Sequence, residues 1–328
     1  MFDYFRLIRI NNIFFIAFTQ LLMSEVVIAP ILQTFGFDNG CEGTYLFLLI
    51  ASTVLIAAGG YVLNDYFDIK IDNINHPEKQ ILGKTISRKS AMYLHQILTG
   101  IGVFCGLLLA YFAQSVTLVF IFVVVPGLLW FYSASYKRQF IIGNLVVAFL
   151  AAITVLIVGI IQLAFLQKIY GNLIFETPIP KQLYGWIGGF ALFSFLCTWI
   201  REIIKDMEDI NGDKELECRT LPIKIGTPKT KIITFILIII TITTIAVLNM
   251  FYIPFEGLLT TRYIIWGLIL PFIVLGYLIF KSTTPIEFHQ ASTLSKFIML
   301  IGVSYSFIFY FLQAKTYGIS LFNMFIVK

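Results

Sequence analysis

The chain has 328 residues and a net charge of +5, yet only 12% of its residues are charged and 59% are hydrophobic. Soluble domains carry roughly 25% charged residues, so this composition argues against a soluble globular protein. The mean hydropathy of +0.89 agrees. The basic excess is explained below by membrane topology, and we expect no nucleic-acid partner.

The apolar residues occur in nine runs of membrane-spanning length. A helix needs about 20 apolar residues to cross a bilayer, and lipid forces each backbone amide to pair within its own segment. We therefore predict an all-α integral membrane protein, a bundle of nine transmembrane helices that forms one domain over residues 1–328. The predicted spans are residues 12–32, 45–64, 91–113, 116–135, 142–166, 184–204, 232–252, 263–280 and 294–313.

The basic residues predict the orientation in the membrane. All but five of the 23 Lys and Arg residues precede the first run or lie in alternate connections, which places them on one side. Because cytoplasmic loops carry such an excess, we expect the N-terminus and the connections 65–90 and 201–231 in the cytoplasm. The exceptions are Lys168, Lys181, Arg262, Lys315 and Lys328.

The first acidic segment, residues 64–72, extends the second predicted span. Its pattern is N-D-x-x-D-x-x-x-D. Asn64, Asp68 and Asp72 are four residues apart and share one helix face, and Asp65 lies beside that face. Carboxylates at the C-terminal end of a helix are disfavoured by the macrodipole, and these also repel one another. A cation must therefore compensate them.

The second acidic segment, residues 201–213, extends the sixth span. Glu202, Asp206, Asp209 and Asp213 are spaced so that they form one stripe on a continuous helix. Magnesium takes one or two carboxylates together with phosphate oxygens, so two such segments predict Mg²⁺ ions around one diphosphate. The predicted metal ligands are Asn64, Asp65, Asp68, Asp72, Asp206, Asp209 and Asp213.

Basic residues accompany both acidic segments. Carboxylates can coordinate the metal, and cationic side chains can bind phosphate oxygens. This mixture therefore favours a metal–diphosphate site over a merely solvated charged face. The nearby cations are Lys79, Lys137, Arg201, Lys205 and Arg219.

These motifs resemble those of the UbiA-type intramembrane polyprenyl transferases. The first segment continues from Asn75 to Lys79 like the family's N-x-P-x-K string. The second reads R-E-x-x-K-D-x-x-D-x-x-G-D and runs on into R-T-L-P. Arg9 stands where the family has the arginine of R-P-x-N, although Ile10 replaces the proline. Tyr132 and Lys137 are similar to a family pair, with a spacing one residue longer.

The resemblance implies Mg²⁺-dependent transfer of a polyprenyl group from a prenyl diphosphate to a lipophilic acceptor in the membrane. The metal neutralises the leaving diphosphate, and catalysis is mainly electrostatic. We assign catalysis to Asp68, Asp72, Asp206 and Asp209. The residues expected to bind the diphosphate are Asn64, Lys79, Lys137, Arg201, Lys205, Arg9 and Tyr132.

The motifs look most like the lipid-forming subgroup, whose acceptor is a prenylglyceryl phosphate. An aromatic acceptor such as 4-hydroxybenzoate or a naphthoate is the alternative. A cation-coupled transporter is the non-enzyme alternative, but transporter sites lie near the bilayer midplane, whereas these acids gather on one side. A CDP-alcohol phosphotransferase would need D-G-x-x-A-R, which residues 65–90 lack. We expect a multi-pass protein of the cell membrane whose active site faces the cytoplasm.

Overall fold

Nine helices in the described part of the chain are long and apolar enough to span a membrane, which confirms the predicted fold class and helix count. The structure is a computed structural model that describes residues 2–41, 43–75, 77–78, 80–322 and 324–326. The first span joins α2, η1 and α3, and the eighth joins α12, η4 and α13. Helix lengths of 19 to 35 residues suffice to cross the roughly 30 Å hydrocarbon core.

The elements follow one another along the chain with short connections. In order they are α1 (Phe2–Leu7), α2 (Ile10–Leu22), η1 (Met23–Ile28), α3 (Ala29–Thr34), α4 (Thr44–Asn75), α5 (Arg88–Phe112), α6 (Val116–Ala134), η2 (Tyr136–Arg138), α7 (Ile142–Tyr170), η3 (Gly171–Glu176), α8 (Ile179–Glu208), α9 (Ile210–Glu215), α10 (Leu221–Ile225), α11 (Thr227–Phe251), α12 (Leu259–Tyr263), η4 (Ile264–Ile269), α13 (Leu270–Lys281), α14 (Pro285–Tyr317), β1 (Ser320–Leu321) and β2 (Phe325–Ile326).

Polar side chains begin several of the apolar helices. Ser87 and Ser115 accept hydrogen bonds from backbone N–H groups in the first turns of α5 and α6. At α14, Thr284 and Glu287 form a reciprocal capping box. Such caps satisfy the N–H groups that a helix start leaves unpaired, so each helix begins at a defined residue close to the polar end of its span.

One acidic segment has the expected helical structure and the other does not. Helix α4 continues to Asn75, so the first acidic segment is helical throughout. The second is not one continuous stripe, because α8 ends at Glu208 and α9 begins at Ile210. The residues around this break, Asp209 and Asn211 with Gly212, form turns more readily than helix. The chain therefore bends where the sequence suggested a straight helix.

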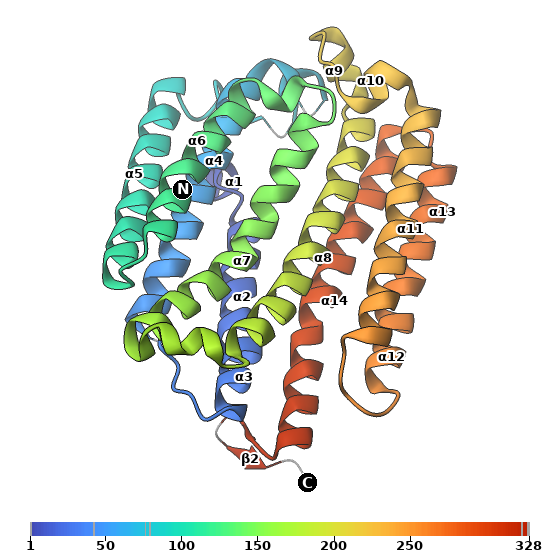
Figure 1. Cartoon of the computed structure of the whole chain (residues 1–328). Helices are drawn as coiled ribbons and strands as arrows, with labels where there is room; N and C mark the ends of the chain where they lie inside the picture. The colour runs from blue at the N-terminus through green and yellow to red at the C-terminus, as the bar shows by residue number, and fades with distance from the viewer. Residues whose placement is uncertain (1, 42, 76, 79, 323, 327–328) are drawn as a thin grey trace.

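Burial separates central helices from peripheral ones. In their most apolar windows the first span, α4, α7 and α14 are half or more buried within the protein, whereas α5 and α6 are only 17% buried. Figure 1 shows α5 and α6 on one flank, α11 and α13 on the other, and α9 and α10 at the end opposite the C-terminus. The central helices therefore enclose the interior of the bundle. The exposed faces of α5 and α6 are left for lipid to cover.

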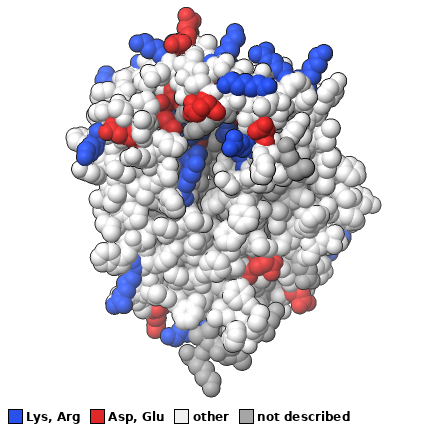
Figure 2. All heavy atoms as spheres, turned by 180° about the vertical axis from the view of Figure 1, so that it is seen from behind, with Lys and Arg blue, Asp and Glu red and all other residues white. Residues whose placement is uncertain are grey.

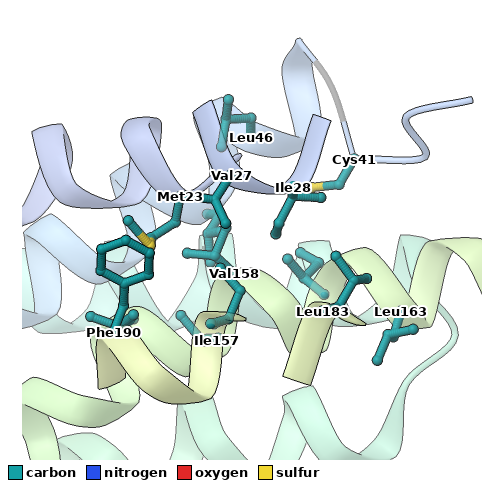
Figure 3. Close-up of a cluster of buried hydrophobic side chains, with 14 of the residues drawn as sticks. Met23, Val27, Ile28, Cys41, Leu46, Ile157, Val158, Leu163, Leu183 and Phe190 are labelled. Carbon is teal, nitrogen blue, oxygen red and sulfur yellow. The ribbon is translucent and has the colours of Figure 1, made fainter. Parts of the chain in front are cut away.

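A cluster of buried apolar side chains fills part of that interior. Met23 of η1, Ile157 and Val158 of α7 and Phe190 of α8 pack together in it (Figure 3). Burial of each such side chain contributes roughly 1.5–3 kcal/mol when the reference is water. In a membrane, where lipid is as apolar as these side chains, the packing contributes mainly van der Waals contact.

Candidate active site

A single elongated cavity of about 730 Å³ runs between α2, α4, α6, α7, α8 and α14. One part is polar and the other is apolar. Its polar lining comes from both acidic segments and from basic side chains on four elements. These polar residues include Arg9, Asn64, Asp68, Asp72, Tyr132, Lys137, Arg201, Glu202, Lys205, Glu208, Asp209 and Lys296.

The apolar part of the cavity follows α2 away from the charges. Asn12, Ile16, Thr19 and Met23 line it at helical spacing, a distance of about 16 Å at 1.5 Å per residue. The lining residues Met23, Ile157 and Phe190 belong to the buried cluster of Figure 3. The cavity therefore has an apolar part, which we call the channel, and a charged part, which we call the chamber.

The first acidic segment presents the predicted face to this chamber. Asn64, Asp68 and Asp72 all line the cavity, and Asp68 is only 2% exposed. Asp65 lies to the side, outside the lining, where its Oδ1 accepts a 2.8 Å hydrogen bond from Nη2 of Arg9. The helical spacing thus correctly predicted which side chains face inward.

Arg9 is held in an uncommon conformation at the start of α2. Its backbone is left-handed, with φ 53° and ψ 59°, which costs a non-glycine residue about 1–2 kcal/mol. The guanidinium contacts Asp65 and lies 5.1 Å from the centre of the Tyr61 ring. Burial alone would lower the pKa of Arg9, but the attraction of Asp65 and neighbouring groups outweighs it and raises that pKa. A permanent positive charge therefore sits at the chamber.

Lys137 provides a second cation from the turn η2. Its Nζ donates to Oδ2 of Asp68, and both Lys137 and Tyr132 line the cavity. Burial on its own would lower the pKa of Lys137, but the nearby Asp68 carboxylate raises it overall. The longer spacing between Tyr132 and Lys137 therefore does not keep either residue from the chamber.

The second acidic segment is only partly brought into the chamber. Asp209 lines the cavity, whereas Asp206 accepts a 2.9 Å hydrogen bond from Asn144 and Asp213 accepts one of 3.0 Å from Thr220. The latter two carboxylates stand beside the lining and not in it. The bend between α8 and α9 explains this difference from a straight stripe.

The two acidic segments nevertheless converge. The pKa of Asp213 is raised to about 6, mainly by burial and further by the carboxylates of Asp209 and Asp68, against a lowering by Thr220 and Lys137. The geometry agrees, because Asn75 at the end of α4 hydrogen-bonds to the backbone of Asp209 and Gly212. The end of α4 therefore lies beside the junction of α8 and α9.

Some residues were placed in the site by the sequence and others were missed. Arg201 and Lys205 line the cavity as expected, and Glu202 accepts hydrogen bonds from both, at 2.9 and 3.4 Å. Lys79 lies outside the described residues. Lys296 of α14 lines the cavity too. It belongs to neither motif, and its only signal in the sequence was that it is a lone cation in an apolar helix.

The carboxylates of the site come from two segments of the chain. Within the described residues, no three His, Cys, Asp or Glu side chains lie close enough to form a metal cage. Magnesium commonly needs only one or two carboxylates when phosphate oxygens complete its shell. Oδ1 of Asn64 is buried and has no hydrogen-bond partner in the described structure, so it offers a further oxygen ligand. The residues present therefore fit a metal that arrives with a phosphate-bearing substrate.

The distribution of surface charge agrees with a membrane setting. On the face shown in Figure 2, acidic and basic side chains gather together at one end, fewer lie at the other, and the band between is almost uncharged. Exposed large apolar side chains such as Phe104, Phe120 and Phe280 would be unfavourable in water but not in lipid. The charged chamber therefore lies toward one membrane surface.

Comparison with known proteins gives consistent matches. A model of the UbiA prenyltransferase family matches residues 26–300. Digeranylgeranylglyceryl phosphate synthase of Sulfurisphaera tokodaii is 31% identical over 245 residues, which cover 74% of this chain and 76% of the relative. The enzyme of the same name from Methanosphaera stadtmanae is 34% identical over 259 residues, with coverages of 79% and 85%.

Solved structures show the same fold. One concerning digeranylgeranylglyceryl phosphate synthase in membranes has a TM-score of 0.64 and 24% identity, and covers 93% of this chain and 96% of that chain. A UbiA homolog from Archaeoglobus fulgidus bound to DMAPP and Mg²⁺ has a TM-score of 0.53 and 13% identity, with coverages of 93% and 99%.

Proposed function

The chain belongs to the UbiA prenyltransferase family, and we propose that it transfers a geranylgeranyl group from its diphosphate to geranylgeranylglyceryl phosphate. The family membership confirms the resemblance seen in the sequence and the assignment to enzymes that transfer prenyl groups. The choice of acceptor rests on relatives named digeranylgeranylglyceryl phosphate synthase that are 31% and 34% identical. Lipid synthesis is thus the process we propose for it.

The cavity is the observation that supports this reaction most strongly. It joins a chamber lined by Asp68, Asp72 and Asp209 to an apolar channel along α2. A prenyl diphosphate has the same two parts, a charged head and a long hydrocarbon tail. A coupled transporter would instead need an ion path across the membrane, whereas the cavity wall around Met23 belongs to a cluster of buried apolar side chains, which offers no ligand to an ion.

We propose that Asp68, Asp72, Asp206, Asp209 and Asp213, with the oxygens of Asn64 and Asp65, hold Mg²⁺ with the diphosphate. Bound there, the metal supplies a Lewis acid that neutralises the departing diphosphate. Asp206 and Asp213 lie just outside the lining, so they would approach it when the metal binds.

The cations of the protein and its apolar channel provide the remaining contributions to catalysis. Arg9 and Lys137 remain protonated and are positioned to donate hydrogen bonds to phosphate oxygens, together with Tyr132. The carbon–oxygen bond to the diphosphate breaks, an ether bond to the acceptor hydroxyl forms, and the hydroxyl proton is released. The apolar channel keeps water from the reactive carbon, which favours attack by the acceptor over hydrolysis.

We propose that the chamber faces the cytoplasm, where soluble prenyl diphosphates and Mg²⁺ are available, and that residues 1–328 act as one domain. The bias of Lys and Arg toward this end of the protein supports that orientation. An aromatic acceptor is the second candidate. Only family membership supports it, because the relatives reported above are all named for the glyceryl phosphate product.

An assay with the purified protein in lipid nanodiscs tests the proposal. The protein is given geranylgeranyl diphosphate and Mg²⁺ with geranylgeranylglyceryl phosphate, 4-hydroxybenzoate or a naphthoate, and products are identified by mass. We expect the doubly prenylated glyceryl phosphate. A prenylated aromatic acid as the main product, with no ether lipid, would overturn the assignment of the acceptor.

A further inference from the structure

Two sets of cations line the chamber, and they have different partners. Arg9 and Lys137 each contact a carboxylate of the first acidic segment, Asp65 and Asp68. Lys296 has no ion pair with any carboxylate in the described part of the chain, although it lines the same cavity. The cations on the α8 and α14 side therefore do not simply neutralise the metal-binding carboxylates.

Lys296 lies opposite two further cations on α8. Arg201 and Lys205 line the cavity and are close enough to Lys296 to influence it electrostatically. These two share a single carboxylate, Glu202, and Nε of Arg201 is buried without a hydrogen-bond partner in the described structure. An unpaired donor and an excess of positive charge in one place indicate a site that an anion completes.

One nearby acidic group, Glu208, offsets part of this excess. It lines the cavity and attracts Lys296, and its Oε1 accepts a 2.7 Å hydrogen bond from Nδ1 of His289. Three cations thus face two carboxylates, Glu202 and Glu208. Thr293, one turn before Lys296 on α14, also lines the cavity, but its hydroxyl donates to the backbone carbonyl of His289. The three cations form what we call the α8–α14 basic site: Arg201, Lys205 and Lys296.

The same face of α14 becomes apolar immediately beyond the basic site. Phe297, Leu300 and Val303 line the cavity at helical spacing after Lys296. Phe297 is 58% exposed and Leu300 is 40% exposed, whereas Ile56 and Ile157 on the α4 and α7 side are almost fully buried. One cavity wall is thus enclosed, and the other lies open to the lipid.

We propose that the α8–α14 basic site binds the phosphate monoester of the lipid acceptor, and that the acceptor's tail lies along Phe297, Leu300 and Val303. The proposal rests on the proposed function and names the part of the site that recognises its acceptor. It reassigns Arg201 and Lys205, which the sequence had suggested for the donor diphosphate. The enclosed channel along α2 is left for the tail of the donor.

The chemistry of a glyceryl phosphate suits this arrangement. Its phosphate is separated from the adjacent carbon-bound hydroxyl by only two carbons and one ester oxygen. A phosphate held by Lys296, which lines the same cavity as Asp68 and Asp72, therefore keeps the hydroxyl near the carbon from which the diphosphate departs. Holding the nucleophile in this way lowers the entropic cost of the reaction.

The test compares Lys296→Met with Lys315→Met, which removes the same charge from the exposed far end of α14. Each variant in nanodiscs is assayed with geranylgeranylglyceryl phosphate and with geranylgeranylglycerol, which lacks the phosphate, and the KM of the donor is measured separately. Lys296→Arg serves as the variant that keeps the charge, and melting temperatures check folding.

We expect Lys296→Met to raise the KM for the phosphorylated acceptor about tenfold or more, the effect of one charge-assisted hydrogen bond. The donor KM and turnover of the neutral acceptor should hardly change, Lys296→Arg should restore most of the affinity, and Lys315→Met should behave as the wild type. A rise in the donor KM instead, or no change in preference between the two acceptors, would overturn the basic site. The proposed function itself would fail separately, if wild-type protein did not prenylate the phosphorylated acceptor.

Discussion

Asn75 and Gly212 tie the two acidic segments together. The side-chain Nδ2 of Asn75 donates a 3.1 Å hydrogen bond to the backbone carbonyl of Asp209, and its Oδ1 accepts one of 2.8 Å from the backbone N–H of Gly212. The end of α4 is thereby fixed against the bend between α8 and α9. A Cβ at position 212 would lie 2.6 Å from Nδ2 of Asn75, so only glycine permits this contact.

We expect Gly212→Ala to reduce kcat about tenfold or more, because the new methyl group separates Asn75 from the second segment and a displacement of about 1 Å in a catalytic group can cost 100-fold. Asn75→Ala should have a similar effect by removing both hydrogen bonds. Steady-state kinetics with saturating substrates measure it. Gly185→Ala is the matched control, since its Cβ would meet no atom within 4 Å. Equal activity in Gly212→Ala and Gly185→Ala would show that the contact does not position the site.

Asp68→Asn and Asp209→Asn should each lower turnover by about 100-fold or more, since each removes a charge that we assign to the metal–diphosphate complex. The two residues come from different segments but line one cavity. Diphosphate release is measured for each variant, with Asp38→Asn in an exposed loop as the control. Near-normal release by both site variants would contradict the assignment of these carboxylates.

The apolar channel should control the length of the prenyl donor. Met23 and Phe190 both line the cavity and belong to the buried cluster, so Met23→Trp should shorten the channel and favour farnesyl over geranylgeranyl diphosphate. Competition between the two donors, followed by product mass, measures the shift. Met250→Trp, at a position 74% exposed, is the control. An unchanged preference would mean that the donor tail does not reach Met23.

The orientation in the membrane can be tested by cysteine labelling. In a background without the four native cysteines, we expect cysteines at Lys84 and Lys214 to react with a membrane-impermeant reagent only from the cytoplasmic side. A cysteine at Lys181 should react only from the other side. All three positions are exposed. Labelling of Lys84 and Lys214 from opposite sides would rule out a shared chamber.

Much of the fold followed from local sequence, because long apolar runs have few alternatives to helices in lipid. Spacing on one helix also predicted correctly that Asn64, Asp68 and Asp72 face one way. The break between α8 and α9 was missed, because an argument from residue spacing takes for granted that the helix is continuous. The two π-helical turns, η1 and η4, had no visible pattern either.

The residues missed in the site share a cause. Asn75 acts on a segment 137 residues away through Gly212, and Lys296 reaches the chamber only because α14 packs against α8. Such contacts depend on tertiary packing, which cannot be read from the spacing of residues along the sequence. A possible signal was the presence of Lys296 in an otherwise apolar run, because an unpaired charge at membrane depth is costly and usually functional.

The most direct measurement follows diphosphate release and ether-lipid formation together in nanodiscs, with geranylgeranyl diphosphate and geranylgeranylglyceryl phosphate, before and after chelation of divalent metal. We predict that the two products form in equal amounts, that chelation stops both, and that Mg²⁺ restores both. Ether formation that persists after complete chelation, or diphosphate release without any ether lipid, would contradict a magnesium-dependent prenyl transfer at the chamber formed by the two acidic segments.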